Sequence, residues 1–144
     1  MPVSMLSGAL TLPGSYGLPM IDLLYSELAG RLYECLQRIH YELGPGVFHH
    51  VYHRATEVEL NEQNLSFERV LEIPVFYEGE YLGKRDCRLL IVDGKVVVAA
   101  FAVREMSPAF DVRMKHYLRH FDLKLGLLAN FSSERLDVRP VRIA

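Results

Sequence analysis

The sequence of 144 residues has no tryptophan, two cysteines and no long hydrophobic run. A helix that spans a bilayer needs about 20 consecutive apolar residues, so no such helix is predicted. Cys35 and Cys87 lack the CxxC spacing of metal and redox sites, which favours a reduced, cytoplasmic protein without a cofactor. The net charge of −2 at pH 7 predicts no general attraction to a polyanion or a membrane surface.

The start of the chain also lacks the basic residues of a signal peptide. It is rich in leucine, glycine and proline, and we expect an extended arm at residues 1–20 ahead of a single domain at residues 21–144. Apolar side chains on such an arm are expected to be buried against protein surface. The surface that buries them could belong either to the arm's own domain or to a neighbouring subunit.

The centre of the chain consists of two apolar, β-branched runs, residues 88–92 and 95–103, on either side of Asp93 and Gly94. Asp-Gly between such runs is a strong hairpin signal, because the tight connection needs a backbone that tolerates positive φ. Residues 96–103 carry no charge. We therefore expect a central strand that is covered on both faces, by helices or by a partner chain.

The remaining elements follow from periodicity. Two helices are expected at residues 21–43 and 47–63, separated by Gly44-Pro45-Gly46, and a third from Ser107-Pro108 to about residue 120. The second helix is expected to bury Val47, Val51, Ala55, Val58 and Leu60.

Strands are expected at residues 67–77, 81–92, 95–103, 123–131 and 137–143, with Pro74 implying an edge or a bulge. The predicted fold class is an α/β sandwich of order ααβββαββ with a mixed central sheet flanked by helices.

Several segments in this order resemble the GxxExxY proteins, a compact branch of the PD-(D/E)xK nuclease-like superfamily with a restriction-endonuclease-like fold. The segments are IHYELGPGVFHHVY (39–52), IPVFYEG (73–79), DGKVVV (93–98), YL (117–118) and LGLLANF (125–131). The resemblance implies a nuclease ancestry. In such enzymes carboxylates hold Mg²⁺, which activates water and neutralises charge on the phosphate, while a lysine positions the attacking water.

The catalytic positions that the resemblance implies are substituted. The glutamate of GxxExxY is His49, the aspartate falls on Leu89 or, with a shift of one residue, on Arg88, and Glu-x-Lys becomes Ala99 and Phe101. The glutamine that often follows on the next helix is Arg113. Leu89, Ala99 and Phe101 should share one sheet face, because alternate strand residues point the same way. We expect an apolar plug there, with no catalytic and no metal-binding residue.

Histidines and basic residues leave two alternatives. One is a metal-dependent nuclease with a relocated site that uses histidines, for which the candidates are His49, His50, His53, His116 and His120. The other is nucleic-acid binding without cleavage through the third helix and its exit, with phosphate contacts from Arg113, Lys115, Arg119 and Lys124. A simpler explanation of these charges is pairing with the acidic second helix, at Glu57, Glu59 and Glu62, in the same or another subunit.

The favoured hypothesis is a catalytically inactive, nuclease-like domain that acts as a structural or interaction module. Its apolar former active site, apolar arm and uncharged central strand predict a homo-oligomer or larger assembly, in which the arm is a candidate contact.

Overall fold

A computed structural model describes residues 24–143 of the protein, so the predicted arm at residues 1–20 lies outside the described residues. The elements follow the predicted order ααβββαββ. They are α1 (Ser26–Leu43), α2 (His49–Glu62), β2 (Phe67–Tyr77), β3 (Glu80–Val92), β4 (Val96–Phe101), α3 (Pro108–Phe121), β5 (Leu125–Asn130) and β6 (Asp137–Arg142). No helix within residues 24–143 is long and apolar enough to cross a membrane.

The strands form one five-stranded mixed sheet in the order β2-β3-β4-β5-β6. All neighbours are antiparallel except β4 and β5, which run parallel and are connected through α3. The central position predicted for residues 96–103 is confirmed, because β4 lies between β3 and β5. The prediction for Pro74 is also confirmed, since β2 is an edge strand whose pairing with β3 has two irregularities.

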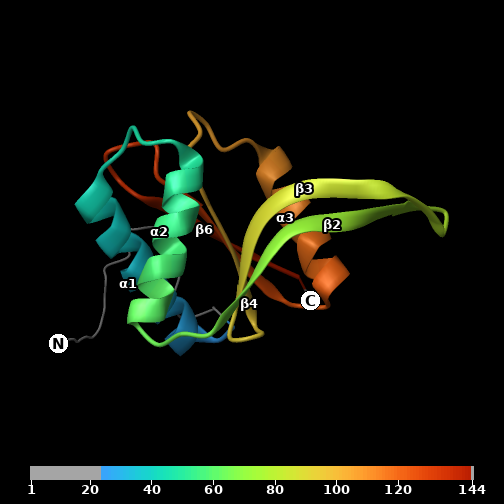
Figure 1. The fold of residues 1–144 in the computed structure, drawn as a ribbon, viewed down its shortest axis with the longest axis horizontal. Helices are drawn as coiled ribbons and strands as arrows, with labels where there is room; N and C mark the ends of the chain where they lie inside the picture. Colours follow the sequence, from blue (N-terminus) through green and yellow to red (C-terminus); the bar gives the residue numbers. More distant parts are fainter. Residues whose placement is uncertain (1–23, 144) are drawn as a thin grey trace.

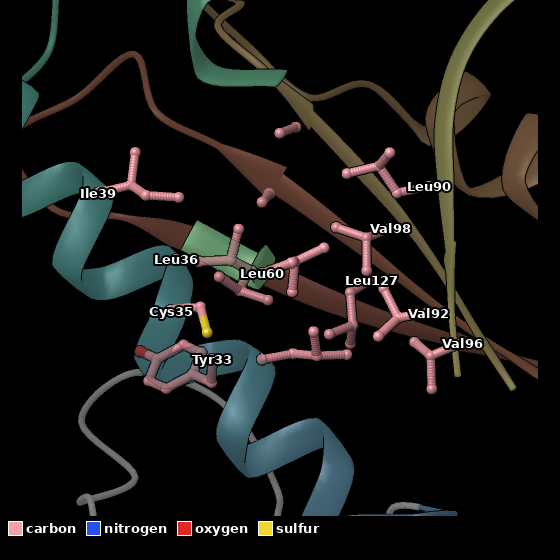
Figure 2. Close-up of a cluster of buried hydrophobic side chains, with 14 of the residues drawn as sticks. Tyr33, Cys35, Leu36, Ile39, Leu60, Leu90, Val92, Val96, Val98 and Leu127 are labelled. Atoms are coloured by element: carbon pink, nitrogen blue, oxygen red, sulfur yellow. The ribbon is translucent and has the colours of Figure 1, made fainter. Parts of the chain in front are cut away.

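Helices cover both faces of the sheet (Figure 1). One core lies between the sheet and the α1/α2 pair, and in Figure 2 Leu36 and Ile39 of α1 lie across this core from the strand residues Leu90, Val98 and Leu127. A second core lies between the opposite face and α3, with Met114 and Leu118 at its centre. The uncharged β4 is therefore covered by helices of its own chain.

The turns form where local sequence predicted them. Asp93 and Gly94 have φ of 55° and 64°, and Lys95 N–H donates to the Val92 carbonyl at 3.0 Å. After α1, Gly44 at φ 68° ends the helix and its N–H donates to the His40 carbonyl at 2.8 Å. Positive φ is strained for most side chains but not for glycine, which explains why these turns are readable from sequence.

The predicted inward face of α2 is confirmed for Leu60, and Val47 and Ala55 pack partly buried against the first core, but the prediction was wrong for Val58. Val58 is 56% exposed, while the helix buries Tyr52, His53, Thr56 and Glu57 together with Leu60. Hydrophobicity was an incomplete guide here, because the buried polar side chains of α2 have partners. Thr56 donates to the Tyr52 carbonyl, and Glu57 accepts from Arg54 of the same helix and from Arg69 of β2. Pairing of α2 with the basic third helix of the same chain was wrong for a related reason, since α2 and α3 pack against opposite faces of the sheet.

Candidate functional site

Leu89 and Ala99 lie on the sheet face that α3 covers. The register pairs Leu90 with Val98, and both of these point toward α1 and α2. Leu89 and Ala99 are the next residues along their strands and so point the other way, into the second core. Leu89 is 2% exposed. The predicted apolar face is therefore present in the structure.

Phe101 completes this face at the end of β4. Its ring stacks on Phe110 of α3, with ring centroids 5.0 Å apart and an angle of 23° between the planes. The guanidinium carbon of Arg113 lies 5.5 Å from the centre of the Phe110 ring. Aromatic rings in such contact exclude water and gain about 0.5–1.5 kcal/mol beyond their buried area. We call Leu89, Ala99, Phe101 and Phe110 the apolar plug.

His49 lies at the same end of the sheet as the plug but is exposed. It begins α2, one turn before Tyr52, whose ring stacks on Phe131 with centroids 4.4 Å apart. The N–H of Phe131 donates to the carbonyl of Phe101 at 2.8 Å. This chain of contacts fixes the start of α2 beside the end of β4, as Figure 1 also shows. Tyr52 itself is structural, since its hydroxyl donates to the Gly44 carbonyl at 2.5 Å.

The donor set at these positions does not fit a divalent metal. Mg²⁺ requires hard oxygen ligands, whereas His49, Leu89, Ala99 and Phe101 supply one exposed imidazole and no oxygen. Glu72 of the neighbouring strand β2 is engaged elsewhere, in an ion pair with Lys84 at 2.9 Å. Within residues 24–143, no three His, Cys, Asp or Glu side chains lie together as a metal site would require.

A polar groove of about 530 Å³ adjoins the plug where β4 and β5 end. Its lining contains Arg104, Arg139, Glu105 and Asp137, so charges of both signs are present. Arg139 is already used, because its guanidinium donates to the Met106 carbonyl at 3.4 Å and lies 3.7 Å from Asp137. The groove therefore carries no clear preference for a ligand of one charge.

Asn130, at the base of this groove, has a structural role that sequence reasoning missed. Its side-chain oxygen accepts from the N–H of Val103 at 3.0 Å, and its side-chain nitrogen donates to the Val103 carbonyl at 3.0 Å. The buried amide thereby satisfies both backbone groups of a residue that has left β4. The signal was available, since Asn130 is a polar residue inside the apolar segment 125–131.

A buried polar cluster joins α2 to β2 on the other side of the sheet. Glu57 accepts two hydrogen bonds from Arg69 at 2.8 and 2.9 Å and one from Arg54 at 2.9 Å. His53 Nε2 lies 3.0 Å from a Glu57 oxygen without hydrogen-bond alignment, and both side chains are almost fully buried. The cluster anchors the edge strand β2 to the helix layer.

The environment of this cluster shifts two pKa values. Burial lowers the pKa of His53, although the Glu57 carboxylate opposes the shift. The hydrogen bonds from Arg69 hold the pKa of Glu57 below its ordinary value, although burial opposes them. The structure therefore favours a neutral imidazole beside an ionised carboxylate.

The basic residues proposed for nucleic acid are spread over α3 and its exit. Lys115 and Arg119 are exposed and four residues apart, so they share a helix face. Lys124 is exposed beyond the end of the helix, whereas Arg113 is half-buried above Phe110. Three of the four candidates are thus available to a partner. His116 and His120 are also exposed and belong to no metal-ligand group within the described residues.

Sequence reasoning also missed an exposed apolar surface at the tip of the β2–β3 hairpin. Figure 1 shows this hairpin projecting past α3. Phe76, Tyr77, Tyr81 and Leu82 are 56–67% exposed, and the rings of Phe76 and Tyr81 contact each other with centroids 5.7 Å apart. We call these four side chains the tip patch. Alternation of apolar residues in a strand does not reveal whether a helix covers them.

Comparisons with known proteins place the chain at the level of a superfamily. No curated protein and no solved structure matches it. A match to a family covers residues 26–143, which includes all the helices and strands described above. The five-stranded mixed sheet with three helices is consistent with a restriction-endonuclease-like fold. The chain belongs to the PD-(D/E)XK nuclease superfamily.

Proposed function

We propose that this protein is a catalytically inactive member of the superfamily that serves as a structural or interaction module and self-associates. The apolar plug carries the proposal. Its stacked aromatic rings and buried leucine occupy the sheet face where the resemblance implies an aspartate, a glutamate and a lysine. A carboxylate on this apolar face would lose its hydration without gaining a hydrogen bond or a counter-ion, which is unfavourable.

Inactivity is tested by incubating the full chain with single- and double-stranded DNA and RNA in the presence of Mg²⁺ or Mn²⁺. We expect no cleavage above a buffer control. Cleavage that depends on the metal and co-purifies with the protein would overturn the proposal.

Self-association is tested by size-exclusion chromatography with light scattering. The exposed tip patch supports it, because Phe76 and Tyr81 contact each other while more than half exposed, and clustered exposed apolar side chains can mark a contact site. We expect a mass above that of one chain at micromolar concentration. A strict monomer would contradict this part of the proposal.

Nucleic-acid binding without cleavage is a second candidate, because Lys115, Arg119 and Lys124 are exposed on and just after α3. Phosphate contacts release counterions, so affinity must fall steeply as salt rises. A titration of a fluorescent oligonucleotide at several salt concentrations tests it. Absence of binding, or affinity that does not change with salt, would exclude this candidate.

A further inference from the structure

The tip patch has the character of a binding surface. It places four large apolar side chains on the two arms of one hairpin, each more than half exposed. Contiguous exposed apolar surface on a soluble domain marks an interaction site more often than chance. Phe76 and Tyr81 pair across the hairpin and lie on the face opposite Ile73, which is buried in the core beneath α3. The Phe76–Tyr81 face of the tip patch is therefore left for a partner.

A small hollow beside the patch favours an apolar side chain as the anchor. It has a volume of about 280 Å³ and is lined by Ile73, Pro74 and Tyr81, together with Glu72 and Lys84. The two charged side chains pair with each other at 2.9 Å. The hollow therefore presents apolar walls and a charge pair that is already neutralised, which suits an aliphatic side chain better than a charged one.

Pro74 restricts how a partner can bind. It lies in the edge strand β2, where an added strand would otherwise pair with free backbone groups. Proline has no N–H to donate, and the two irregularities of β2 bend its edge further from regular pairing. A partner is thus expected to contact the side chains of the patch rather than extend the sheet.

The chain itself contains a segment of matching chemistry. Residues 1–21 include no Asp, Glu, Lys or Arg and carry Leu6, Leu10, Leu12, Leu18 and Met20. This segment lies outside the described residues, which begin at residue 24. An uncharged, leucine-rich segment suits the contacting rings of Phe76 and Tyr81 and the apolar walls of the hollow.

The position where the described chain begins favours a segment from another copy. Tyr25 lies beside the β3–β4 turn, with the Lys95 ammonium 5.6 Å from its ring centre. The tip patch is at the opposite end of β3, whose 13 residues span about 40 Å. Residues 1–23 reach at most about 80 Å when fully extended. Within one chain, about half of this length would serve only to reach the patch, whereas a segment from a second copy is not bound by this distance.

We propose that residues 1–23 of a second copy of this chain dock on the tip patch. A leucine of that segment would fill the hollow beside Tyr81. This inference rests on the proposed self-association and specifies its interface. The contact is directional, because one copy contributes the N-terminal segment and the other the hairpin.

Complementation in the full chain tests the proposal. One variant, Phe76→Ser with Tyr81→Ser, changes only exposed hairpin residues, and a second, Leu10→Ser with Leu12→Ser, changes only the N-terminal segment. Tyr41→Ser is the matched control, because Tyr41 is 86% exposed on α1 and away from the hairpin. Thermal unfolding of each variant verifies folding.

We expect wild type and Tyr41→Ser to associate in light scattering, and each double variant alone to be a monomer. An equimolar mixture of the two double variants should regain a two-chain complex, since one retains an intact segment and the other an intact patch. If both double variants still associate, or if only the hairpin variant fails to associate, the docking proposal is overturned while self-association stands. If wild type itself is a monomer, the proposed self-association fails and the docking proposal with it.

Discussion

The sulfur of Met114 on α3 lies 2.5 Å from the point that a Cβ on Gly126 of β5 would occupy. The absence of a side chain at Gly126 therefore sets how closely α3 packs on the sheet beside the apolar plug. Met114 is 1% exposed, so it has little room to move away.

Gly126→Ala is expected to lower the free energy of unfolding by about 1–3 kcal/mol, the usual cost of overpacking a filled core. Urea denaturation followed by circular dichroism measures it. Met114→Ala alone opens a cavity and should also destabilise. The double variant should lose less than the two single losses combined, because removing the sulfur relieves the clash. Additive losses would show that the close contact is not what sets the packing.

Glu57→Gln is expected to lower the free energy of unfolding by about 1–3 kcal/mol, because the buried carboxylate loses its charge-assisted hydrogen bonds while the half-exposed Arg69 can still be hydrated. Glu59→Gln is the matched control on the same helix. Its partner Arg38 is half exposed, so the loss should be about 0.2–1 kcal/mol. Equal losses for the two variants in urea denaturation would contradict a structural role for the buried cluster.

The lowered pKa of His53 predicts that stability falls in mild acid. In the unfolded chain, His53 binds a proton near pH 6.5. In the folded chain its imidazole is buried, so His53 binds that proton only at a lower pH. Below about pH 6.5 the unfolded state therefore holds more protons and stability declines until the folded imidazole also titrates. Above that pH the imidazole is neutral in both states and contributes no slope.

His53→Gln should flatten the decline between about pH 6.5 and pH 5 relative to wild type, even if its overall stability is lower. Exposed Val112→Gln is the control, because it removes no titratable group and should leave the slope unchanged. Unfolding midpoints in urea across this range measure the slope. A wild type whose stability does not change, or a slope that persists in His53→Gln, would contradict the predicted environment of His53.

Leu89→Asp tests whether the plug tolerates the carboxylate that the superfamily places on this strand. We expect a loss of at least about 3 kcal/mol, because an isolated charge would be buried on an apolar face. Leu89→Met conserves volume and should cost less than about 1.5 kcal/mol. Mg²⁺ or Mn²⁺ should not restore the stability of Leu89→Asp, since Ala99 and Phe101 supply no further oxygen. Full recovery on adding metal would mean that other ligands are within reach.

Local features were predictable from the sequence. The Asp93-Gly94 turn, the end of α1 at Gly44 and the start of α3 at Ser107 all depend on residues within one or two turns of each other. Ser107, for example, caps its helix by accepting from the N–H of Ala109 at 3.3 Å. Such short-range contacts leave a signature in consecutive residues, and the element order followed from them.

Features that depend on distant partners were not predictable. The inward face of α2 was partly misassigned because buried Glu57 is paired not only with Arg54 of its own helix but also with Arg69, twelve residues away on β2. The tip patch was missed for the converse reason, since the strand pattern at Phe76 and Tyr81 does not say where α1, α2 and α3 stop covering the sheet.

Asn130 was missed because it acts through Val103, a residue from a different segment. For the apolar plug, strand alternation predicted a shared face at once, but the stacking of Phe101 on Phe110 required the structure.

The central claim is that the sheet face around Phe101 has lost the ability to hold a divalent cation. The most direct measurement is Mn²⁺ binding by the metal-free full chain, followed by electron paramagnetic resonance of the free ion at increasing protein concentration. We predict that the free Mn²⁺ signal stays at the level of a protein-free control. Stoichiometric uptake of Mn²⁺ at micromolar concentration, abolished by removing a carboxylate near the plug, would contradict the account and identify a working metal site.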